Sequence, residues 1–212
     1  MSGPDASTSD SPSEASPSAV SPSALDPAPV PEATGIEIDG CALLNDDELE
    51  TLAGEVVGGA RPGMLPGGMP NCRWSLSNGS FIQVIAASAS DWARSLPEAL
   101  RAIEATGAAI DPDQVKALRD AARLVEGGGQ VEPDEACELF SQMLELRGEE
   151  PGQDHTLNVV PSRDDPHAVN GQMCSDGRFT SVMIASDDGL TEPLPMQLVI
   201  DATQIAHGRA RL

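Results

Sequence analysis

The spacing of apolar residues changes several times along this chain, and each spacing predicts a helix or a strand. A helix is predicted to begin at the capping box Asn45-Asp46-Asp47-Glu48 and to end before Gly58-Gly59. Its apolar face comprises Leu49, Leu52, Ala53 and Val56. Apolar and polar residues alternate from Cys72 to Ser77, which predicts a half-buried strand. Asn78-Gly79 then predicts a tight turn with positive φ angles, and Phe81–Ala87 is apolar on both faces, as in a central strand.

The middle of the chain alternates between segments that break regular structure and segments with helical spacing. Residues 61–70 are too rich in proline and glycine for a helix or a strand. Helices are predicted over about 91–106 and from Asp111-Pro112, and Gly127-Gly128-Gly129 marks the clearest internal boundary. The elements predicted beyond that boundary are a helix from Pro133, a strand over 157–160, a polar loop over 162–171, a strand over 178–185 and a helix over 195–210.

Two passages, Cys41–Ser88 and Cys137–Ser186, share one order of features, and each contains two of the four cysteines. Both begin Cys-x-Leu, reach a second cysteine and a hairpin dipeptide, and continue x-Phe-x-x-Val-x-x-Ala-Ser. This order predicts a duplication, and hence an α+β fold of two tandem helix–β-hairpin repeats that share one antiparallel sheet. Of the three possible cysteine connectivities, the repeat selects one disulfide within each copy, Cys41–Cys72 and Cys137–Cys174.

The domain organisation follows from the repeat and from a change in composition near the N-terminus. Residues 1–35 form a Ser-, Pro- and Ala-rich segment without lysine or arginine, which predicts a disordered spacer. The first α+β repeat is predicted over 36–128 and the second over 129–212. Together they are long enough for one compact unit.

The charge balance argues against one class of partner. The chain has 34 acidic and 12 basic residues, which give a net charge of −22. Such a charge opposes electrostatic binding to nucleic acid or to an anionic membrane surface. We therefore expect no nucleic-acid partner, and a membrane association only through a lipid anchor that this chain does not carry.

Cysteine usage and the N-terminal spacer favour an exported protein. The sequence as written shows no signal peptide and no transmembrane segment, which read literally indicates a cytoplasmic acidic protein with free thiols. Paired cysteines behind a Ser/Pro spacer are instead typical of processed bacterial lipoproteins. We expect an extracytoplasmic protein at the outer face of the cell membrane, with Met1 in place of a removed signal and lipobox. The cytoplasmic interpretation stays open.

A family resemblance supports the same expectation. The stretch Cys41–Gly54, followed by Cys72-Arg73-Trp74-Ser75, resembles a family of actinobacterial extracytoplasmic lipoproteins that carry a domain of unknown function. Those proteins show Cys-x-Leu-Leu, a capped helix that ends in glycine, and Cys-x-Trp at the start of a strand. The resemblance implies export, lipid anchoring, a structural disulfide and an α+β fold. It implies no established activity and supplies no catalytic residues.

Candidate catalytic chemistry is sparse in this chain. The sequence contains no nucleophile elbow, phosphate-binding glycine loop, zinc-protease motif or calcium loop, and no cysteine spacing suits a metal. We therefore expect no enzyme activity, no cofactor and no metal. The alternative is an envelope hydrolase that uses the loop histidines His155 and His167, each of which has an acid nearby in the sequence.

The segment 61–70 is the strongest candidate for a partner site, because it places Met64, Leu65 and Met69 in a loop. Methionine-bearing loops form adaptable contact surfaces. The competing interpretation, that these side chains pack on their own core, stays open. The predicted function is a non-enzymatic binding or interaction module for an unknown protein or envelope ligand, with segment 161–171 as the counterpart loop.

Overall fold

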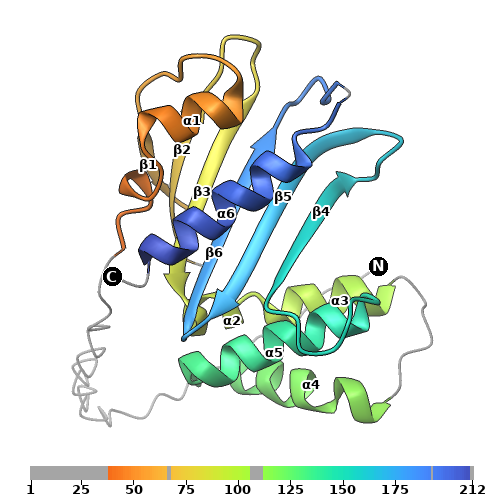
Figure 1. Ribbon diagram of the computed structural model, residues 1–212. Coiled ribbons are helices and arrows are strands. Elements are labelled where there is room, and N and C mark those ends of the chain that lie inside the picture. Colours follow the sequence, from red (N-terminus) through yellow and green to blue (C-terminus); the bar gives the residue numbers. More distant parts are fainter. Residues whose placement is uncertain (1–37, 66–67, 106–111, 192, 211–212) are drawn as a thin grey trace, which may run out of the picture. The chain divides into compact units, whose positions relative to one another are not determined.

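The fold is built on one six-stranded antiparallel sheet with the strand order β1-β2-β3-β6-β5-β4 (Figure 1). The computed structural model describes residues 38–65, 68–105, 112–191 and 193–210, so the spacer predicted at 1–35 lies outside the described residues. The elements follow one another in the order η1 (Gly40–Ala42), α1 (Asp46–Ala53), β1 (Arg61–Met64), β2 (Pro70–Ser75), β3 (Phe81–Ser88), α2 (Ala89–Ala93), α3 (Leu96–Ala105), α4 (Pro112–Glu126), α5 (Pro133–Leu146), β4 (His155–Pro161), β5 (Pro166–Ser175), β6 (Arg178–Ala185) and α6 (Met196–Ala210).

Two consecutive three-stranded meanders, β1–β3 and β4–β6, meet at the antiparallel pair β3–β6 in the middle of the sheet. The predicted α+β class and the antiparallel sheet are therefore confirmed. In the β3–β6 register Val84 lies opposite Val182, and Ile82 lies opposite Ile184. These two strands thus occupy the central positions that their apolar runs predict.

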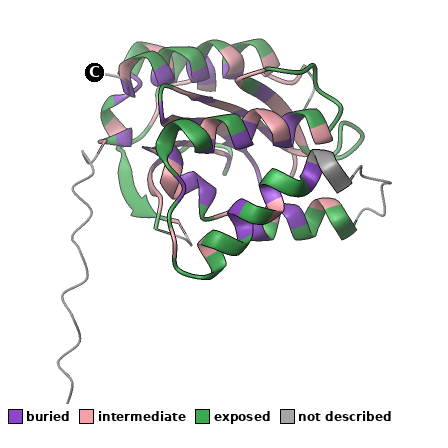
Figure 2. Ribbon diagram, turned by 90° about the horizontal axis from the view of Figure 1, so that it is seen from below, coloured by how far each residue is buried: buried purple, intermediate pink, exposed green. Residues whose placement is uncertain are grey.

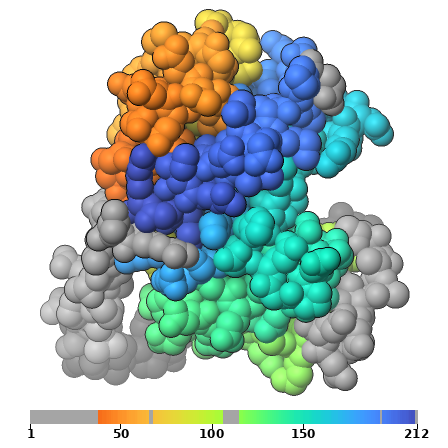
Figure 3. All heavy atoms as spheres, viewed as in Figure 1, coloured from red at the N-terminus to blue at the C-terminus, as the bar shows by residue number. Residues whose placement is uncertain are grey.

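The first face of the sheet is covered by η1, α1 and α6, as the space-filling view shows for α1 and α6 (Figure 3). Alternate residues of β2, β3 and β6 point to this face, because successive side chains of a strand point to opposite sides. The large side chains of this first core are Leu49, Leu52, Trp74, Ile82, Val84, Val182 and Val199.

An ion pair at the edge of the first core ties α1 to α6. Glu48 accepts a hydrogen bond from the backbone N–H of Asn45 at 2.9 Å, which completes the predicted capping box. Both carboxylate oxygens of Glu48 also accept hydrogen bonds from Arg209, at 2.6 and 2.7 Å. Arg209 in addition donates to the carbonyl of Leu43. The hydrogen bonds from Arg209 hold the pKa of the Glu48 carboxyl below its ordinary value.

Helices α2–α5 gather at one end of the sheet and cover that end of its second face (Figure 1, Figure 2). Their buried residues surround an aromatic group formed by Trp92, Phe140 and Phe179. The ring centroids of Trp92 and Phe140 are 5.3 Å apart in an edge-to-face arrangement, and those of Trp92 and Phe179 are 5.9 Å apart and stacked. Because Phe179 belongs to β6, this aromatic group fastens the helices to the sheet.

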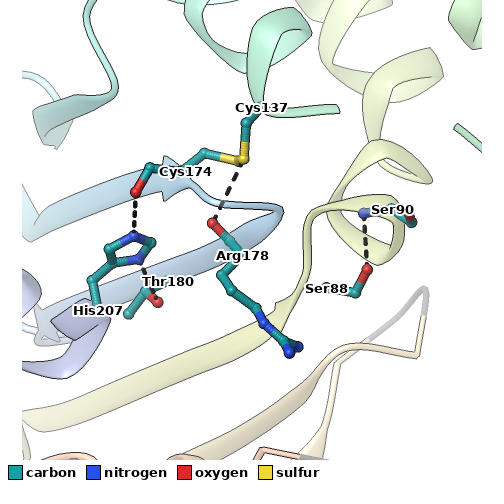
Figure 4. Close-up of a disulfide and its surroundings, with 8 residues drawn as sticks. Ser88, Ser90, Cys137, Cys174, Arg178, Thr180 and His207 are labelled. Carbon is teal, nitrogen blue, oxygen red and sulfur yellow. Dashed lines mark hydrogen bonds between the residues drawn. A yellow bond between two sulfur atoms is a disulfide. The ribbon is translucent and has the colours of Figure 1, made fainter. Parts of the chain in front are cut away.

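Each core contains one disulfide, and both pairings are those predicted from the repeat. Cys41–Cys72 joins η1 to β2 in the first core. Cys137–Cys174 joins α5 to β5 in the second core (Figure 4). The bridges therefore attach a helical segment to the sheet once in each half of the chain.

The two cysteines of the sheet nevertheless occupy different places in their halves. Val84 of β3 and Val182 of β6 are equivalent residues of the predicted repeat. Cys72 of β2 lies opposite Val84, but the residue of β5 that lies opposite Val182 is Gly171 and not Cys174. An added Cβ at Gly171 would clash with the Oγ1 of Thr203 on α6. A glycine at this position thus allows α6 to approach β5 closely.

Two helix boundaries differ from the predictions for local reasons. α1 ends before Gly54 rather than at Gly58-Gly59, because Gly54 forms a left-handed cap with a φ of 73°. Val56 therefore lies beyond the helix, and it is 81 % exposed. The helix predicted over 91–106 is in fact two helices, since Pro97 lies in the first turn of a new helix, where its missing N–H is tolerated.

Both segments predicted as loops contain strand residues. Arg61–Met64 pairs with β2 at the edge of the sheet. Pro62 is tolerated there because an edge strand has a neighbouring strand on one side only, so the missing N–H of proline need not leave a hydrogen bond unmade. The polar segment 162–171 is a loop only over 162–165, since β5 begins at Pro166. The polar side chains of β5 alternate with buried ones, so their polarity reflects a sheet face without a helix on it.

The two predicted hairpin turns also differ from each other. Asp176-Gly177 forms a two-residue turn in which both φ angles are positive, 49° and 68°. Between β2 and β3 only Gly79 has a positive φ, of 84°, because a bond of 2.8 Å from the N–H of Leu76 to the carbonyl of Ser80 closes a longer turn. The expectation of a positive φ at Asn78 is therefore wrong.

Removal of one bridge should destabilise the fold. Replacing Cys137 and Cys174 together by serine is expected to lower the free energy of unfolding by about 3–4 kcal/mol, because a bridge across 37 residues restricts the unfolded chain. Chemical denaturation measures this loss, and the Cys41/Cys72 double variant, with a separation of 31, should lose a similar amount. Labelling of any cysteine in denatured, unreduced protein would contradict the two bridges.

The contribution of the Glu48–Arg209 pair should depend on pH. Glu48→Gln is expected to lower the free energy of unfolding by about 1 kcal/mol at neutral pH. Because the folded-state pKa of Glu48 lies below its ordinary 4.5, this stabilisation is complete above pH 4.5 and is lost as the pH falls through the folded-state pKa. Urea denaturation at several pH values between neutral and acidic measures the free energy of unfolding of the wild type and of this variant, with the exposed Glu50→Gln as the control. If the difference in free energy of unfolding between the wild type and Glu48→Gln does not become smaller at acidic pH, the stabilising role of the Glu48 carboxylate is contradicted.

Candidate functional site

The second face of the sheet, beyond the end that α2–α5 cover, is mainly polar. The strand register aligns its side chains in rows, so that Gln83 lies opposite Met183 and Met183 lies opposite Asn170. We call this surface the uncovered face, and it comprises Arg61, Asn71, Arg73, Ser75, Phe81, Gln83, Asn158, Asn170, Gln172, Ser181 and Met183, with Ile85 at its border against the second core. None of the six described strands contains an aspartate or a glutamate, although the chain has 34 acids.

A cavity of about 240 Å³ lies where the uncovered face meets the helices. Its polar lining consists of Gln83, Asn170, Gln172, Ser181 and Ser95, and its main apolar lining of Met69, Trp92 and Phe179. Pockets for whole small molecules usually measure about 300–1,000 Å³. This cavity is therefore of a size to hold one ring or one side chain of a ligand that extends onto the uncovered face.

The polar groups of the cavity are only partly hydrogen-bonded within the protein. The hydroxyl of Ser181, which is 2 % exposed, donates to Oδ1 of Asn170 at 2.7 Å. This bond orients the Asn170 amide and leaves its NH₂ group available as a donor. The side-chain amides of Gln83 and Gln172 make no hydrogen bond to the residues that the structure describes. The cavity thus presents donors and acceptors side by side.

The residues predicted as a partner site, Met64, Leu65 and Met69, do not form one surface. Met64 ends β1 at the sheet edge and is 63 % exposed, while Leu65 and Met69 are half-buried. Met69 alone lines the cavity, where it packs against the second core. The counterpart turn at 162–165 lies at the opposite end and the opposite edge of the sheet, so the two segments do not converge. Their role in partner binding stays a prediction.

The two loop histidines lie at opposite ends of the β4–β5 hairpin. Nδ1 of His155 is 2.9 Å from Asp154, and Nε2 of His167 is 3.4 Å from Asp165. Their side chains are 51 % and 41 % exposed. The structure therefore does not bring the two rings together in one cleft, which is the arrangement that a hydrolase based on them needs.

The third histidine, His207, faces the sheet from α6 and is 1 % exposed. Its Nε2 lies 2.8 Å from Oγ of Ser175, and its Nδ1 lies 3.0 Å from Oγ1 of Thr180 (Figure 4). A Ser–His contact of this length also occurs in nucleophilic sites. Here the burial of the ring excludes a substrate, so the contacts anchor α6 to β5 and β6. The sequence signal for this burial is that His207 follows Val199 and Thr203 at four-residue spacing.

No protein-family model, curated protein or solved structure matches this chain. Among the described residues, no helix is long and apolar enough to span a lipid bilayer. In the same part of the chain, no three His, Cys, Asp or Glu side chains are grouped as a metal site requires. We take the uncovered face and its cavity as the candidate site, because the side-chain amides of Gln83 and Gln172 lie there without a hydrogen-bond partner among the described residues.

Two neighbouring residues of β6 test which side of the sheet is accessible. Thr180→Val removes a buried hydroxyl in contact with His207 and should lower the free energy of unfolding by about 1–3 kcal/mol. Ser181→Ala should cost less than about 1 kcal/mol, because water in the cavity can replace the lost bond to Asn170. Urea denaturation compares the two variants. Equal losses would show that Ser181 does not border an accessible cavity.

Proposed function

We propose that this protein is a non-enzymatic binding module that holds a small polar ligand on the uncovered face. The observation that carries the proposal is the pair of glutamine amides, Gln83 and Gln172, which line the cavity without a hydrogen-bond partner among the described residues. Partly enclosed polar groups gain free energy when they are hydrogen-bonded. A ligand with several hydroxyl groups would supply those bonds, since an amide can donate to one hydroxyl and accept from the next.

The lining of the cavity supports binding rather than chemistry. No histidine, cysteine, aspartate or glutamate is among the described residues that line it. General acid–base catalysis and nucleophilic catalysis both use such groups within hydrogen-bond reach of the substrate. A neutral amide-lined site is suited to recognition of uncharged polar groups.

The same proposal places the protein outside the cytoplasm, at the cell envelope. Both disulfides join a helical segment to the sheet, and the described residues include no free cysteine. Structural disulfides form and persist in oxidising compartments. The resemblance of Cys41–Gly54 to extracytoplasmic lipoproteins adds the proposal of a lipid-anchored form at the outer face of the membrane.

We also propose that the two halves of the sheet arose by duplication. Their strands occur as β1-β2-β3 and, in reverse, as β6-β5-β4, and the matched residues Val84 and Val182 lie opposite each other. The helices do not follow this symmetry, since α1 and α6 cover the first face whereas α2–α5 cover one end of the second. The cavity lies where the halves differ, because its wall comes from α2 and its floor from both halves.

Titration of the full chain with neutral monosaccharides, glucose and N-acetylglucosamine, tests the binding function. NMR spectra should show shifts of the side-chain amide signals of Gln83, Asn170 and Gln172, while Gln204, exposed on α6, serves as the unshifted control. Gln172→Leu should weaken this binding by about tenfold, because it removes hydrogen bonds to the ligand. Shifts that are absent, or that lie away from the uncovered face, would count against the proposed function.

A further inference from the structure

Two arginines on neighbouring strands of the uncovered face have no acidic partner among the described residues. Arg61 of β1 lies directly opposite Arg73 of β2 in the strand register, and both side chains are exposed. Neither forms an ion pair with any residue that the structure describes. Among the described arginines, Arg147, Arg163 and Arg178 likewise make no ion pair, whereas the arginines that pair with acids are Arg94, Arg101, Arg119, Arg123 and Arg209.

No acidic side chain on the neighbouring strands compensates the two positive charges. Like charges directly opposite each other on neighbouring strands destabilise the strand pair. The chain has almost three acids for each base, 34 against 12, yet none of its acids lies on the strands beside Arg61 and Arg73. An anion that bridges the two arginine side chains would neutralise both charges and add charge-assisted hydrogen bonds.

The ring of Phe81 holds the guanidinium group of Arg73 in place by stacking against it. The Cζ atom of Arg73 lies 3.3 Å from the centroid of the Phe81 ring, a cation–π contact. The N–H donors of a guanidinium point outward in its own plane, so stacking on a ring leaves them free for a bidentate oxyanion. The ring thus restricts the motion of Arg73 without consuming its donors.

We infer that Arg61 and Arg73 form a phosphate-binding end of the uncovered face, and that the ligand is a phosphorylated saccharide. This inference rests on the proposed function, because the saccharide part would occupy the amide row. A phosphomonoester carries nearly two negative charges at neutral pH, which matches two guanidinium groups better than a carboxylate does. Arg73 lies directly opposite Gln83, one strand spacing of about 5 Å away, so the sugar of a monosaccharide phosphate would contact Gln83, whereas Asn170 lies about 14 Å from Arg73 along the row.

The surroundings favour a saccharide over a nucleotide as the bearer of the phosphate. Binding of a base usually needs an exposed aromatic face on which it can stack. Trp92 and Phe179 beside the cavity are 4 % and 2 % exposed, and the Phe81 ring already contacts Arg73. The remaining lining of amides and hydroxyls, including Gln83 and Asn170, suits the hydroxyl groups of a sugar.

Titration of glucose 6-phosphate into the full, disulfide-bonded chain tests this inference, with glucose and inorganic phosphate as comparison probes. Glucose 6-phosphate should bind at least about tenfold more tightly than either comparison probe. Arg61→Ala and Arg73→Ala should each weaken its binding by about tenfold and leave glucose binding unchanged. Arg163→Ala, an exposed arginine on the β4–β5 turn, is the matched control for loss of one charge and should have no effect.

Thermal denaturation checks that these variants are folded. Arg61→Ala should not lower the melting temperature, because it removes a like-charge pair, and it should abolish the stabilisation that glucose 6-phosphate gives the wild type. If the Arg61 and Arg73 variants bind glucose 6-phosphate as the Arg163 variant does while Gln83→Leu still weakens glucose binding, the phosphate end is overturned and the proposed function stands. Equal affinity for inorganic phosphate and glucose 6-phosphate would overturn the saccharide assignment. If none of the probes shifts the NMR signals of residues on the uncovered face, both proposals are overturned.

Discussion

The rest of the structure depends on the antiparallel pairing of β3 with β6. Eight residue pairs, from Phe81–Ala185 to Ser88–Arg178, join two three-stranded meanders that would otherwise be separate small sheets with exposed edges. The pairing places Val84 opposite Val182, so that the first core draws apolar side chains from both halves of the chain. It also sets the floor of the cavity, which combines residues of β3 with residues of β5 and β6. The core and the candidate site are thus consequences of one strand register.

The side chains on the two faces of the sheet have different surroundings. On the first face α1 and α6 cover an aliphatic core, and the ion pair between Glu48 and Arg209 joins the two helices at its edge. On the second face α2–α5 cover only the end that carries Phe179 and Cys174. A mixed row of amides, hydroxyls and arginines can remain in contact with solvent without the cost of burying unpaired polar groups. The partial cover therefore explains why the strands carry polar side chains on this face.

Much of the fold could be predicted because its signals are local. The capping box before α1, the proline at the start of α5 and the central strands all follow from short patterns, and the repeat alone selects the correct disulfides. The strand residues within 61–70 and 162–171 were missed because an edge strand tolerates Pro62, and because β5 is polar on the side without a helix.

The candidate site could not be predicted from sequence for a different reason. Gln83, Asn170 and Ser181 are ordinary strand residues, far apart in the chain, and only the strand register brings them to one cavity. Of Met64, Leu65 and Met69, only Met69 lines the cavity, since Met64 ends the edge strand β1 and is exposed. Residues that meet through long-range register leave no local pattern in the sequence.

An anion site is compatible with a protein whose net charge is −22, because the two effects act over different distances. The charge of the whole molecule repels anions over a range set by screening, about 8 Å at physiological salt. Contact with the guanidinium groups of Arg61 and Arg73 acts within hydrogen-bond distance and is screened much less. A polyanion such as a nucleic acid must place many charges against the acidic surface, whereas a single phosphate group need reach only a strand pair without acids. At the proposed site the overall charge would thus add selectivity, because it would oppose extended polyanions while the two arginines accept one compact anionic group.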